Sequence, residues 1–396
     1  MRQEYDIIVS GGGIAGLSAA AAFGSAGYSV LCVDPTPPVM AEADPASDLR
    51  TTAFLQPSVK VLEAAGLWDR FVPHAMPLQV MRIVDAGGQE PEPRVSHEFN
   101  AADISDQPFG WNLPNWLLRR ECVARLEELD NVTFRPGVGT RSLTTRESAA
   151  IVGLSDGTSA RARLLVAADG RNSPMRTALG INVQTTRFGQ KALAFAVTHP
   201  VPHENVSTEI HRSGGPFTFV PLPDRDGQPC SAIVWMETGP EVLRLAALEE
   251  AAFEAAMDRR SCGLFGPLKL ASRRTVWPII SQIAERFHGE RTALMAEAAH
   301  VVPPIGAQGL NMSLADLAVL LDLATQEGLG EPAMLSAYHR RRYPDVALRV
   351  AGVGMLNRAS MLEAQPLRDA RAKMLDALYS AAPVRRALMQ MGIGTR

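Results

Sequence analysis

At 396 residues, with a formal net charge of −3 at pH 7, the chain is long enough for two or three domains and lacks the basic excess of a nucleic-acid-binding protein. Its 46% apolar and 20% charged residues are ordinary globular usage, which excludes a disordered or fibrous chain. The four cysteines form no CxxC pair, so we expect reduced, buried thiols and neither a metal site nor a disulfide framework. The polar first residues and the strand-sized apolar run after them predict no signal peptide and no membrane span, and hence a cytoplasmic protein.

The first predicted elements are two short apolar strands at Tyr5–Ser10 and Ser29–Val33. Between them, GGGIAGLSAAAAFGSAG reads as a glycine turn followed by a helix of small residues. Asp34 follows the second strand, where the dinucleotide-binding unit places an acid that binds ribose hydroxyls. Strand, turn, helix, strand and acid therefore occur in the order of that unit.

The glycines of this turn form GxGxxG at Gly11, Gly13 and Gly16. The first supports the tight turn, the second lets a pyrophosphate approach the backbone, and the third lets the helix pack on the strand. The helix would begin at Ile14 and Ala15 and present free N–H groups to the phosphates. The alternative is a tight turn with chance glycines, and the motif does not distinguish NAD from FAD.

The next candidate strand, Leu164–Ala168, ends at Asp169 in the segment RARLLVAADGRNSPMR. Its continuous apolar run is typical of a buried parallel strand. An acid at the carboxyl end of such a strand lies where ligands bind in open α/β sheets. A helix cap followed by a turn is an equal alternative.

A third strand, predicted at Thr292–Ala296, is followed by Glu297 and by the loop within MAEAAHVVPPIGAQGLNMSLAD. In this loop Pro304 stiffens the path, while Gly306 and Gly309 let the backbone approach a planar ligand. A helix is predicted over Leu310–Ala324, and one of its faces carries Leu310, Leu314, Leu317 and Leu321.

Taken in order, GxGxxG, A-x-D-G-x-x-S-x-x-R, an acid followed by Ala-Ala-His, and PPxGxQGLN resemble the class A flavoprotein monooxygenases. RTTAFLQPSVKVLEAAGLW (Arg50–Trp68), GPFTFVPLP (Gly215–Pro223) and PPIGAQGLNMSLAD are most similar to the ubiquinone-biosynthesis hydroxylases. The resemblance spans nearly the whole chain. It implies an α/β fold, with an FAD-binding Rossmann-like domain of the glutathione-reductase type, a β-sheet substrate domain and a C-terminal helical region.

The expected FAD-binding domain comprises residues 1–77, 104–185 and 278–330, and the substrate domain comprises 78–103 and 186–277. Alternating runs such as KALAFAVTH predict that the substrate domain is a sheet over the flavin. Phe217, Phe219 and Pro221 are candidates to line an apolar pocket above the ring, with Pro304 at its side. The alternative is that the phenylalanines belong to the core.

The resemblance also implies roles for single residues. The loop would lie against the isoalloxazine ring, and the helix N-terminus would point at the N1–C2=O edge, where negative charge collects on reduction. The implied cofactor contacts are Gly309, Leu310 and Asn311 to the ring, Glu297 to the ribityl chain, Asp169 to the nucleotide part, Arg50 to flavin or pyrophosphate, and Asn115 and Arg119 as braces. A surface salt bridge is the alternative for Arg119.

One departure concerns Ala296-Glu297, which stands where the family usually has Gly-Asp. We expect FAD to be kept, with the ribityl contact displaced. His300 is expected to be a structural histidine held by hydrogen bonds.

Residues 331–396 are predicted to be helical, with breaks near Pro344, Pro366 and Pro383. This region has eleven Lys and Arg against five Asp and Glu, with Met and Leu residues interspersed. Such basic amphipathic helices indicate peripheral contact with a membrane or with an acidic partner of a biosynthetic complex. A solvated helical face is the alternative.

The function implied by the resemblance is hydroxylation of an aromatic ring, in the closest relatives a polyprenylated phenol of ubiquinone biosynthesis. NAD(P)H would reduce FAD, and O2 would be activated at its C4a carbon. A single GxGxxG suggests that NAD(P)H binds transiently, and no catalytic side chain is nominated because the cofactor carries the chemistry. The alternatives are a hydroxylase of another aromatic compound and a non-catalytic flavin-fold scaffold, which the Ala296-Glu297 departure would favour.

Overall fold

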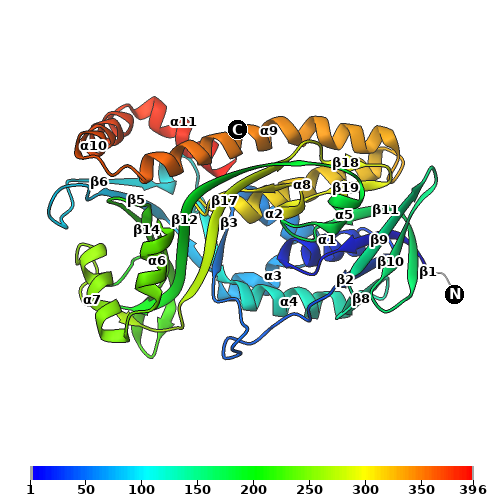
Figure 1. Cartoon of the computed structure of the whole chain (residues 1–396), viewed down its shortest axis with the longest axis horizontal. Helices are drawn as coiled ribbons and strands as arrows, with labels where there is room; N and C mark the ends of the chain where they lie inside the picture. Colours follow the sequence, from blue (N-terminus) through cyan, green and yellow to red (C-terminus); the bar gives the residue numbers. More distant parts are fainter. Residues whose placement is uncertain (1–2, 395–396) are drawn as a thin grey trace.

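The structure is a computed structural model that describes residues 3–394. Figure 1 shows an eight-stranded sheet near the N-terminal end of the molecule and a nine-stranded sheet at the other end. The long C-terminal helix α9 (Pro332–Ser360) contacts strands of both. This mixed α/β architecture is the expected fold class.

The eight-stranded sheet has the order β18-β19-β11-β1-β2-β8, and the hairpin β9–β10 joins it at β11. Its strands β1, β2, β8, β11 and β19 pair in parallel. The bounds are β1 Gln3–Ser10, β2 Val30–Asp34, β8 Val132–Pro136, β9 Thr140–Arg146, β10 Ala149–Leu154, β11 Ser159–Ala167, β18 His288–Gly289 and β19 Thr292–Leu294. The buried parallel strand predicted before Asp169 is therefore confirmed.

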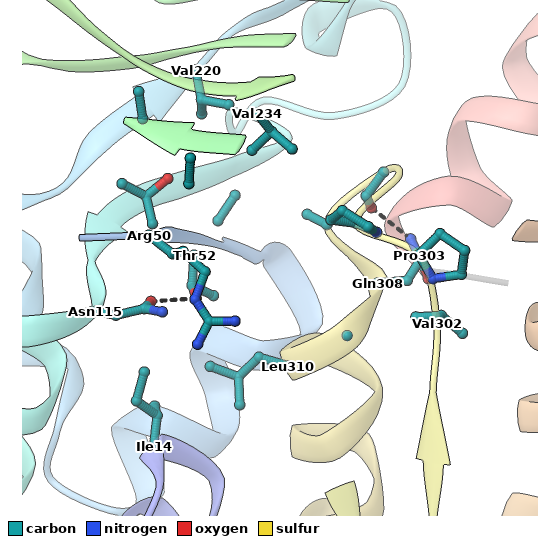
Figure 2. A pocket seen from close by; sticks show the side chains of 18 of the residues that line it. Ile14, Arg50, Thr52, Asn115, Val220, Val234, Val302, Pro303, Gln308 and Leu310 are labelled. Carbon is teal, nitrogen blue, oxygen red and sulfur yellow. Dashed lines mark hydrogen bonds between the residues drawn. The ribbon is translucent and has the colours of Figure 1, made fainter. Parts of the chain in front are cut away.

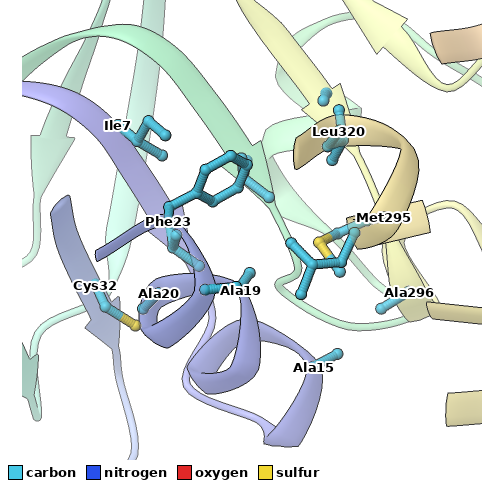
Figure 3. Close-up of a cluster of buried hydrophobic side chains, with 14 of the residues drawn as sticks. Ile7, Ala15, Ala19, Ala20, Phe23, Cys32, Met295, Ala296 and Leu320 are labelled. Carbon is cyan, nitrogen blue, oxygen red and sulfur yellow. The ribbon is translucent and has the colours of Figure 1, made fainter. Parts of the chain in front are cut away.

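Helices cover this sheet because its central strands are apolar on both faces. The helices around it are α1 Ile14–Ser25, α2 Gln56–Ala64, α3 Trp68–Phe71, α4 Asn115–Glu127, α5 Pro174–Ala178 and α8 Gln308–Gln326. Buried alanines such as Ala15 and Ala19 let α1 approach its neighbours closely, and Figure 3 shows them on the side of α1 toward Met295. The main hydrophobic core therefore includes the buried residues of α1, the helix that follows the glycine turn.

The nine-stranded sheet has the order β20-β17-β12-β15-β14-β13-β5-β6, with β16 paired to β12. Its bounds are β5 Val80–Asp85, β6 Val95–Asn100, β12 Val183–Thr198, β13 Val206–His211, β14 Pro216–Arg225, β15 Gln228–Thr238, β16 Lys269–Leu270, β17 Thr275–Ala284 and β20 His300–Val301. Helices α6 (Gly239–Ala246) and α7 (Glu250–Arg260) pack with it around a second core. A third, small sheet has the order β3 Thr51–Leu55, β7 Gly110–Pro114 and β4 Met76–Leu78. In the chain, β3 and β4 come before β5 and β6 of the nine-stranded sheet, and β7 comes after them.

The proposed domain division remains a prediction. Three of its boundaries fall within continuous strands, because β4 spans residue 77, β12 spans residue 185 and β17 spans residue 278. Short 3-10 turns complete the fold at η1 Val72–His74, η2 Ala101–Asp103 and η3 Ala296–Ala298.

The C-terminal region is helical, as expected, and continues after α9 with α10 (Gln365–Ser380) and α11 (Ala382–Ile393). Pro366 and Pro383 stand in the first turns of α10 and α11, so both predicted breaks are confirmed. The predicted break at Pro344 is wrong, because α9 runs through it. Pro344 is exposed, so water can satisfy the carbonyl that loses its helical donor, while buried Tyr338 and Val346 hold both halves against the core.

Candidate functional site

A cavity of about 530 Å³ lies between the carboxyl edge of the eight-stranded sheet and the inner face of the nine-stranded sheet. Figure 2 shows Ile14 and Leu310 on one side of it, Val220 and Val234 on the opposite sheet, and Arg50 between them. A concave site of this size with a few converging polar groups is typical of a cofactor and substrate pocket.

The glycine turn borders this cavity, and its three glycines differ in how much space surrounds them. A Cβ on Gly11, whose φ is +112°, would lie 2.3 Å from the carbonyl oxygen of Ala168, and one on Gly16 would lie 1.9 Å from that of Gly11. A Cβ on Gly13 would meet no atom within 4 Å, and Gly13, Ile14 and Ala15 line the cavity. The first and third glycines are therefore required by packing, whereas the second leaves room for a ligand.

Asp34 lies beside this turn at the end of β2. Its Oδ2 accepts from the backbone N–H of Gly12 at 2.6 Å, and its Oδ1 accepts from that of Thr36 at 2.7 Å. The carboxylate thus orders the turn, and its remaining lone pairs are left for a ligand hydroxyl. It does not itself line the cavity.

Asp169 is turned away from the cavity, which is lined instead by its neighbours Ala168, Gly170 and Arg171. Its Oδ2 accepts from the backbone N–H of Met175 at 3.1 Å at the start of α5, which is the helix-cap geometry. Burial raises the pKa of Asp169. Oδ1 is buried without a partner among the described residues, so one acceptor remains available.

The loop from β19 to α8 folds through several left-handed residues. Ala296, Gly306 and Ala307 have φ of +55°, +65° and +56°. Ala296 therefore occupies, at a cost of about 1–2 kcal/mol, a conformation that suits glycine. The residue after it, Glu297, lines the cavity and lies 3.4 Å from Arg171 in an ion pair.

The N-terminus of α8 opens directly into the cavity. Helix α8 has no side-chain cap, so the N–H groups of its first turn are not satisfied by a capping side chain. Pro304, Gly306, Gly309 and Leu310 line the cavity, and a Cβ on Gly309 would meet nothing within 4 Å. The predicted helix and its place at the site are both present, although α8 begins two residues earlier than expected.

The backbone N–H of Asn311 is expected to donate to the ring, and that contact stays a prediction, while its side chain does not line the cavity. Its Oδ1 accepts from the Leu55 N–H at 2.8 Å and the Ser58 hydroxyl at 2.6 Å. Its Nδ2 donates to the carbonyls of Ala53 and Ala307, at 2.7 and 2.6 Å. All hydrogen-bonding positions of this amide are used, so Asn311 fixes the start of α8 to β3 and α2.

Asp48, which no sequence motif singles out, contacts three of the expected residues. Arg50 donates to it twice, from Nε at 2.8 Å and from Nη2 at 2.7 Å. Asn115 Nδ2 donates to Asp48 at 3.0 Å, and Arg119 lies at 3.5 Å. The Asn115 carbonyl accepts in turn from the Thr52 hydroxyl, as Figure 2 shows.

Burial tends to raise the pKa of Asp48, but Arg50 and the other neighbours lower it more, so the net shift is downward. No motif contains this acid, and only its spacing two residues before Arg50 could have suggested it.

The three candidate substrate residues on β14 do not line the cavity. Phe217 and Phe219 are fully buried in the second core with Trp235 and Phe253, and Pro221 is not among the lining residues. Because side chains alternate along a strand, the cavity face of β14 carries Thr218 and Val220 instead. The prediction was wrong by one residue, and the core alternative is the observed one.

His300 has the structural role that was expected of it. It is 2% exposed, and its Nε2 lies 2.6 Å from Asp316 Oδ2. Asp316 also accepts from Arg342 Nε at 2.7 Å. The histidine is therefore part of a buried ionic group that ties the loop after β19 to α8 and α9.

Two uncapped helix N-termini, of α1 and α8, thus meet at one cavity, and each presents a glycine with open space beside it. The first suits a pyrophosphate and the second a ring edge that becomes negative, and a flavin dinucleotide contains both groups. The residues present fit FAD. Among the described residues no group of three or more His, Cys, Asp or Glu could hold a metal ion.

Several known proteins are similar to this chain in sequence or in fold. The chain matches the FAD binding domain family over residues 4–351. It is 32% identical to ubiquinone hydroxylase UbiL of Rhodospirillum rubrum, covering 98% of this chain and 90% of that one. It is 25% identical to 3-demethoxyubiquinol 3-hydroxylase of Escherichia coli, covering 99% of each. The crystal structure of p-nitrophenol 4-monooxygenase from Pseudomonas putida superposes with a TM-score of 0.80 at 19% identity, covering 99% of each chain, and so shares the fold. The chain belongs to the FAD-dependent monooxygenase family that includes the ubiquinone-biosynthesis hydroxylases.

Proposed function

We propose that this monooxygenase hydroxylates the ring of a polyprenylated phenol in ubiquinone biosynthesis. The observation that carries the proposal is the single cavity in which two uncapped helix N-termini face a largely apolar sheet wall. The relatives named as ubiquinone hydroxylases supply the substrate class. FAD bound here supplies the redox chemistry, with electrons from NAD(P)H and oxygen from O2.

The chain's own residues bind and orient the cofactor in this proposal. Gly13, Ile14 and Ala15 receive the pyrophosphate at the N-terminus of α1. Asp34 accepts from ribose and Glu297 from the ribityl hydroxyls, while Asp169 fixes the start of α5 beside the cavity. The carboxylate of Asp48 holds Arg50 and Arg119 at the cavity, and these two cations and one anion leave a net positive charge near the cofactor.

Around the reacting ring, the chain stabilises charge and excludes water. The first-turn N–H groups of α8, at Gly309 and Leu310, favour negative charge at the ring edge that faces them. Pro304 borders the ring, and the sheet opposite contributes Val220 and Val234. An apolar wall of this kind removes water from the substrate ring and strengthens the electrostatic interactions inside.

The direct test loads the full-length protein with FAD and follows NADPH and NADH oxidation with 2-farnesylphenol, with unsubstituted phenol and without a phenol. We expect reduction to be fastest with the farnesylated compound and the product to gain one oxygen atom by mass spectrometry. Oxidation that yields only hydrogen peroxide with each phenol would contradict the hydroxylase. Failure to bind FAD would favour the scaffold, and faster turnover of unsubstituted phenol would favour another aromatic substrate.

We further propose that the C-terminal helices contact an anionic membrane surface, from which a polyprenyl substrate can enter. No helix in residues 3–394 is long and apolar enough to cross a membrane. Within residues 3–394, nine of the fourteen exposed large apolar side chains lie on α9–α11, at Leu348, Met355, Leu356, Leu367, Met374, Leu378, Val384, Leu388 and Met391. We call these nine the C-terminal apolar face.

The basic residues of this region divide into two groups. Arg342 and Arg371 are buried and paired with Asp316 and Asp85, so they fasten the helices to the body. Arg358, Lys373 and Arg386 are exposed on the same helices as the C-terminal apolar face. Exposed apolar side chains with a few cations nearby suit a lipid surface better than bulk water.

Sedimentation of the full chain with vesicles tests this contact. We expect binding to phosphatidylglycerol vesicles, weaker binding to phosphatidylcholine vesicles, and loss of binding in the double variant Leu388→Glu, Met391→Glu. The matched control is Leu243→Glu, Val201→Glu, which changes two equally exposed apolar residues elsewhere. Equal loss in both double variants, or no binding by the natural chain, would refute the contact.

A further inference from the structure

The cavity wall formed by the nine-stranded sheet is largely apolar, and apart from Thr218 of β14 and His300 of β20 its polar side chains come from one strand, β13. Its residues Ser207 and Glu209 line the cavity, whereas Thr208 and Ile210 are fully buried on the opposite face. The alternation of a strand therefore aims Glu209 at the cavity and places His211 on the same face. Strands β5, β12, β14, β15 and β17 contribute no titratable side chain to the described cavity lining.

Glu209 and His211 form a close pair on this face. His211 Nε2 lies 2.7 Å from Glu209 Oε1, and the two side chains are 16% and 14% exposed. Nδ1 of His211 is buried and has no hydrogen-bond partner in the described structure. Nε2 is therefore the ring nitrogen that can donate to the Glu209 carboxylate.

The second carboxylate oxygen of Glu209 has no polar partner within residues 3–394. Across the sheet Glu209 is in register with Thr218 of β14 and Ile83 of β5, neither of which carries charge. Two charged groups lie close to the pair: Asp85, which is opposite His211 and bound to Arg94 and Arg371, and Arg260, which donates to the Ile210 carbonyl between the two residues. A carboxylate with a free oxygen, on a largely apolar cavity wall, offers an acceptor to a hydroxyl of the ligand.

The geometry points to Glu209 as the group that accepts the phenolic O–H of the substrate, with His211 as a positioning residue. This inference rests on the proposed function, because it assumes a phenol in the cavity. A phenol suits the site, since it offers one hydroxyl donor on an apolar ring.

This contact would activate the ring as well as orient it. As the phenolic proton moves to Glu209, the oxygen lone pair raises the electron density at the ortho and para carbons. One of those carbons forms the C–O bond with the electrophilic oxygen that the established monooxygenase activity supplies, and a cyclic dienone results. Loss of the proton from that carbon and return of the proton from Glu209 to the phenolic oxygen restore the aromatic ring, so that C–H has become C–OH.

The test compares 2-farnesylphenol with its O-methyl ether, which has no proton to donate. In Glu209→Gln, we expect kcat for the phenol to fall about 100-fold or more. The Kd of the phenol for the FAD-loaded enzyme should weaken about tenfold, while the Kd of the ether, measured by protein fluorescence, stays the same. The charge-matched control is Glu98→Gln, which removes an exposed carboxylate from β6 and should change neither ligand's Kd.

His211→Gln distinguishes positioning from structure. Gln keeps a donor near Glu209, so we expect a smaller loss of kcat than in Glu209→Gln, with the ether's Kd again unchanged. Equal weakening of the phenol and the ether in Glu209→Gln, or unchanged kcat for the phenol, would overturn the assignment while leaving the hydroxylase intact. If the natural enzyme makes no hydroxylated product, the proposed function fails, and equal Kd values for phenol and ether in the natural enzyme would then overturn Glu209 as well.

Discussion

Asp316 of α8 and Arg342 of α9 form an ion pair in the protein interior, with 2.7 Å between Asp316 Oδ1 and Arg342 Nε and side chains that are 0% and 6% exposed. The other carboxylate oxygen accepts from His300, which directly precedes the cofactor loop. Helix α8, whose N-terminus lines the cavity, is therefore fixed to α9 by the ion pair between Asp316 and Arg342. Arg349 of α9 adds a second tie through the Gln308 side chain at 2.8 Å.

Replacing Arg342 with Met should lower the free energy of unfolding by about 3–5 kcal/mol, because it removes the guanidinium from the buried carboxylate of Asp316, which keeps only the bonds from His300 and Ala296. The matched control is Arg341→Met, since Arg341 pairs with Asp322 at the surface. That change should cost at most about 1 kcal/mol. Urea unfolding of both variants checks the difference, and equal losses would contradict the role of the buried pair.

The same pair predicts a dependence of stability on pH. Burial tends to raise the pKa of Asp316, but His300 and Arg342 lower it more, so the net shift is downward. The stability that this carboxylate contributes is therefore fully present above its unfolded pKa of about 3.9 and is lost as the pH falls through the lower native value. Relative to the natural chain, Asp316→Asn should lose less stability between pH 7 and pH 3 in urea unfolding. Parallel pH profiles would contradict the lowered pKa.

The glycine turn predicts opposite outcomes for two alanine substitutions. Gly13→Ala adds a methyl group into open space that faces the cavity, so FAD affinity should fall at least about tenfold, or about 1.4 kcal/mol, with little change in the melting temperature of the protein without FAD. Gly16→Ala would place Cβ 1.9 Å from the Gly11 carbonyl oxygen and should lower that melting temperature. Flavin fluorescence titration and thermal unfolding measure the two effects. Unchanged FAD affinity in Gly13→Ala would remove this turn from the cofactor site.

Ala296→Gly should raise the free energy of unfolding by about 0.5–1 kcal/mol. The left-handed conformation of Ala296 costs about 1–2 kcal/mol, and part of the gain is offset by the greater freedom of glycine in the unfolded chain. Ala370→Gly, at an exposed position inside α10, should instead lower it by about 1 kcal/mol. A loss in both variants would show that Ala296 is not strained.

Neighbouring residues of β14 should separate stability from substrate recognition. Phe219→Ala empties a fully buried position and should cost about 3–5 kcal/mol of unfolding free energy. Val220→Phe enlarges a side chain on the cavity wall and should raise KM for 2-farnesylphenol with a small effect on stability. If Phe219→Ala instead raised KM and Val220→Phe lowered stability, Phe219 would face the cavity and Val220 the core.

Local signals were sufficient wherever covalent geometry or short spacing decides the structure. GxGxxG predicted the turn and α1, because only glycine tolerates the contacts at Gly11 and Gly16. The apolar run before Asp169 predicted a buried parallel strand, and Pro366 and Pro383 marked helix starts. The order of these motifs was enough to indicate the fold, the cofactor and the class of reaction.

Tertiary structure alone decided which side chains reach the cavity. An apolar strand with alternating large residues does not reveal which face meets a ligand, so Phe219 belongs to the core and Val220 to the wall. Pro344 was misjudged because exposure to water and packing of both helix halves can compensate for a lost hydrogen bond. Asp48 and Asp316 gain their roles from partners that folding brings together, Arg119 and Arg342, and Glu209 gains its place at the cavity from the packing of β13 in the sheet. Sequence spacing determines local backbone geometry, whereas contacts between distant charges depend on how the elements pack.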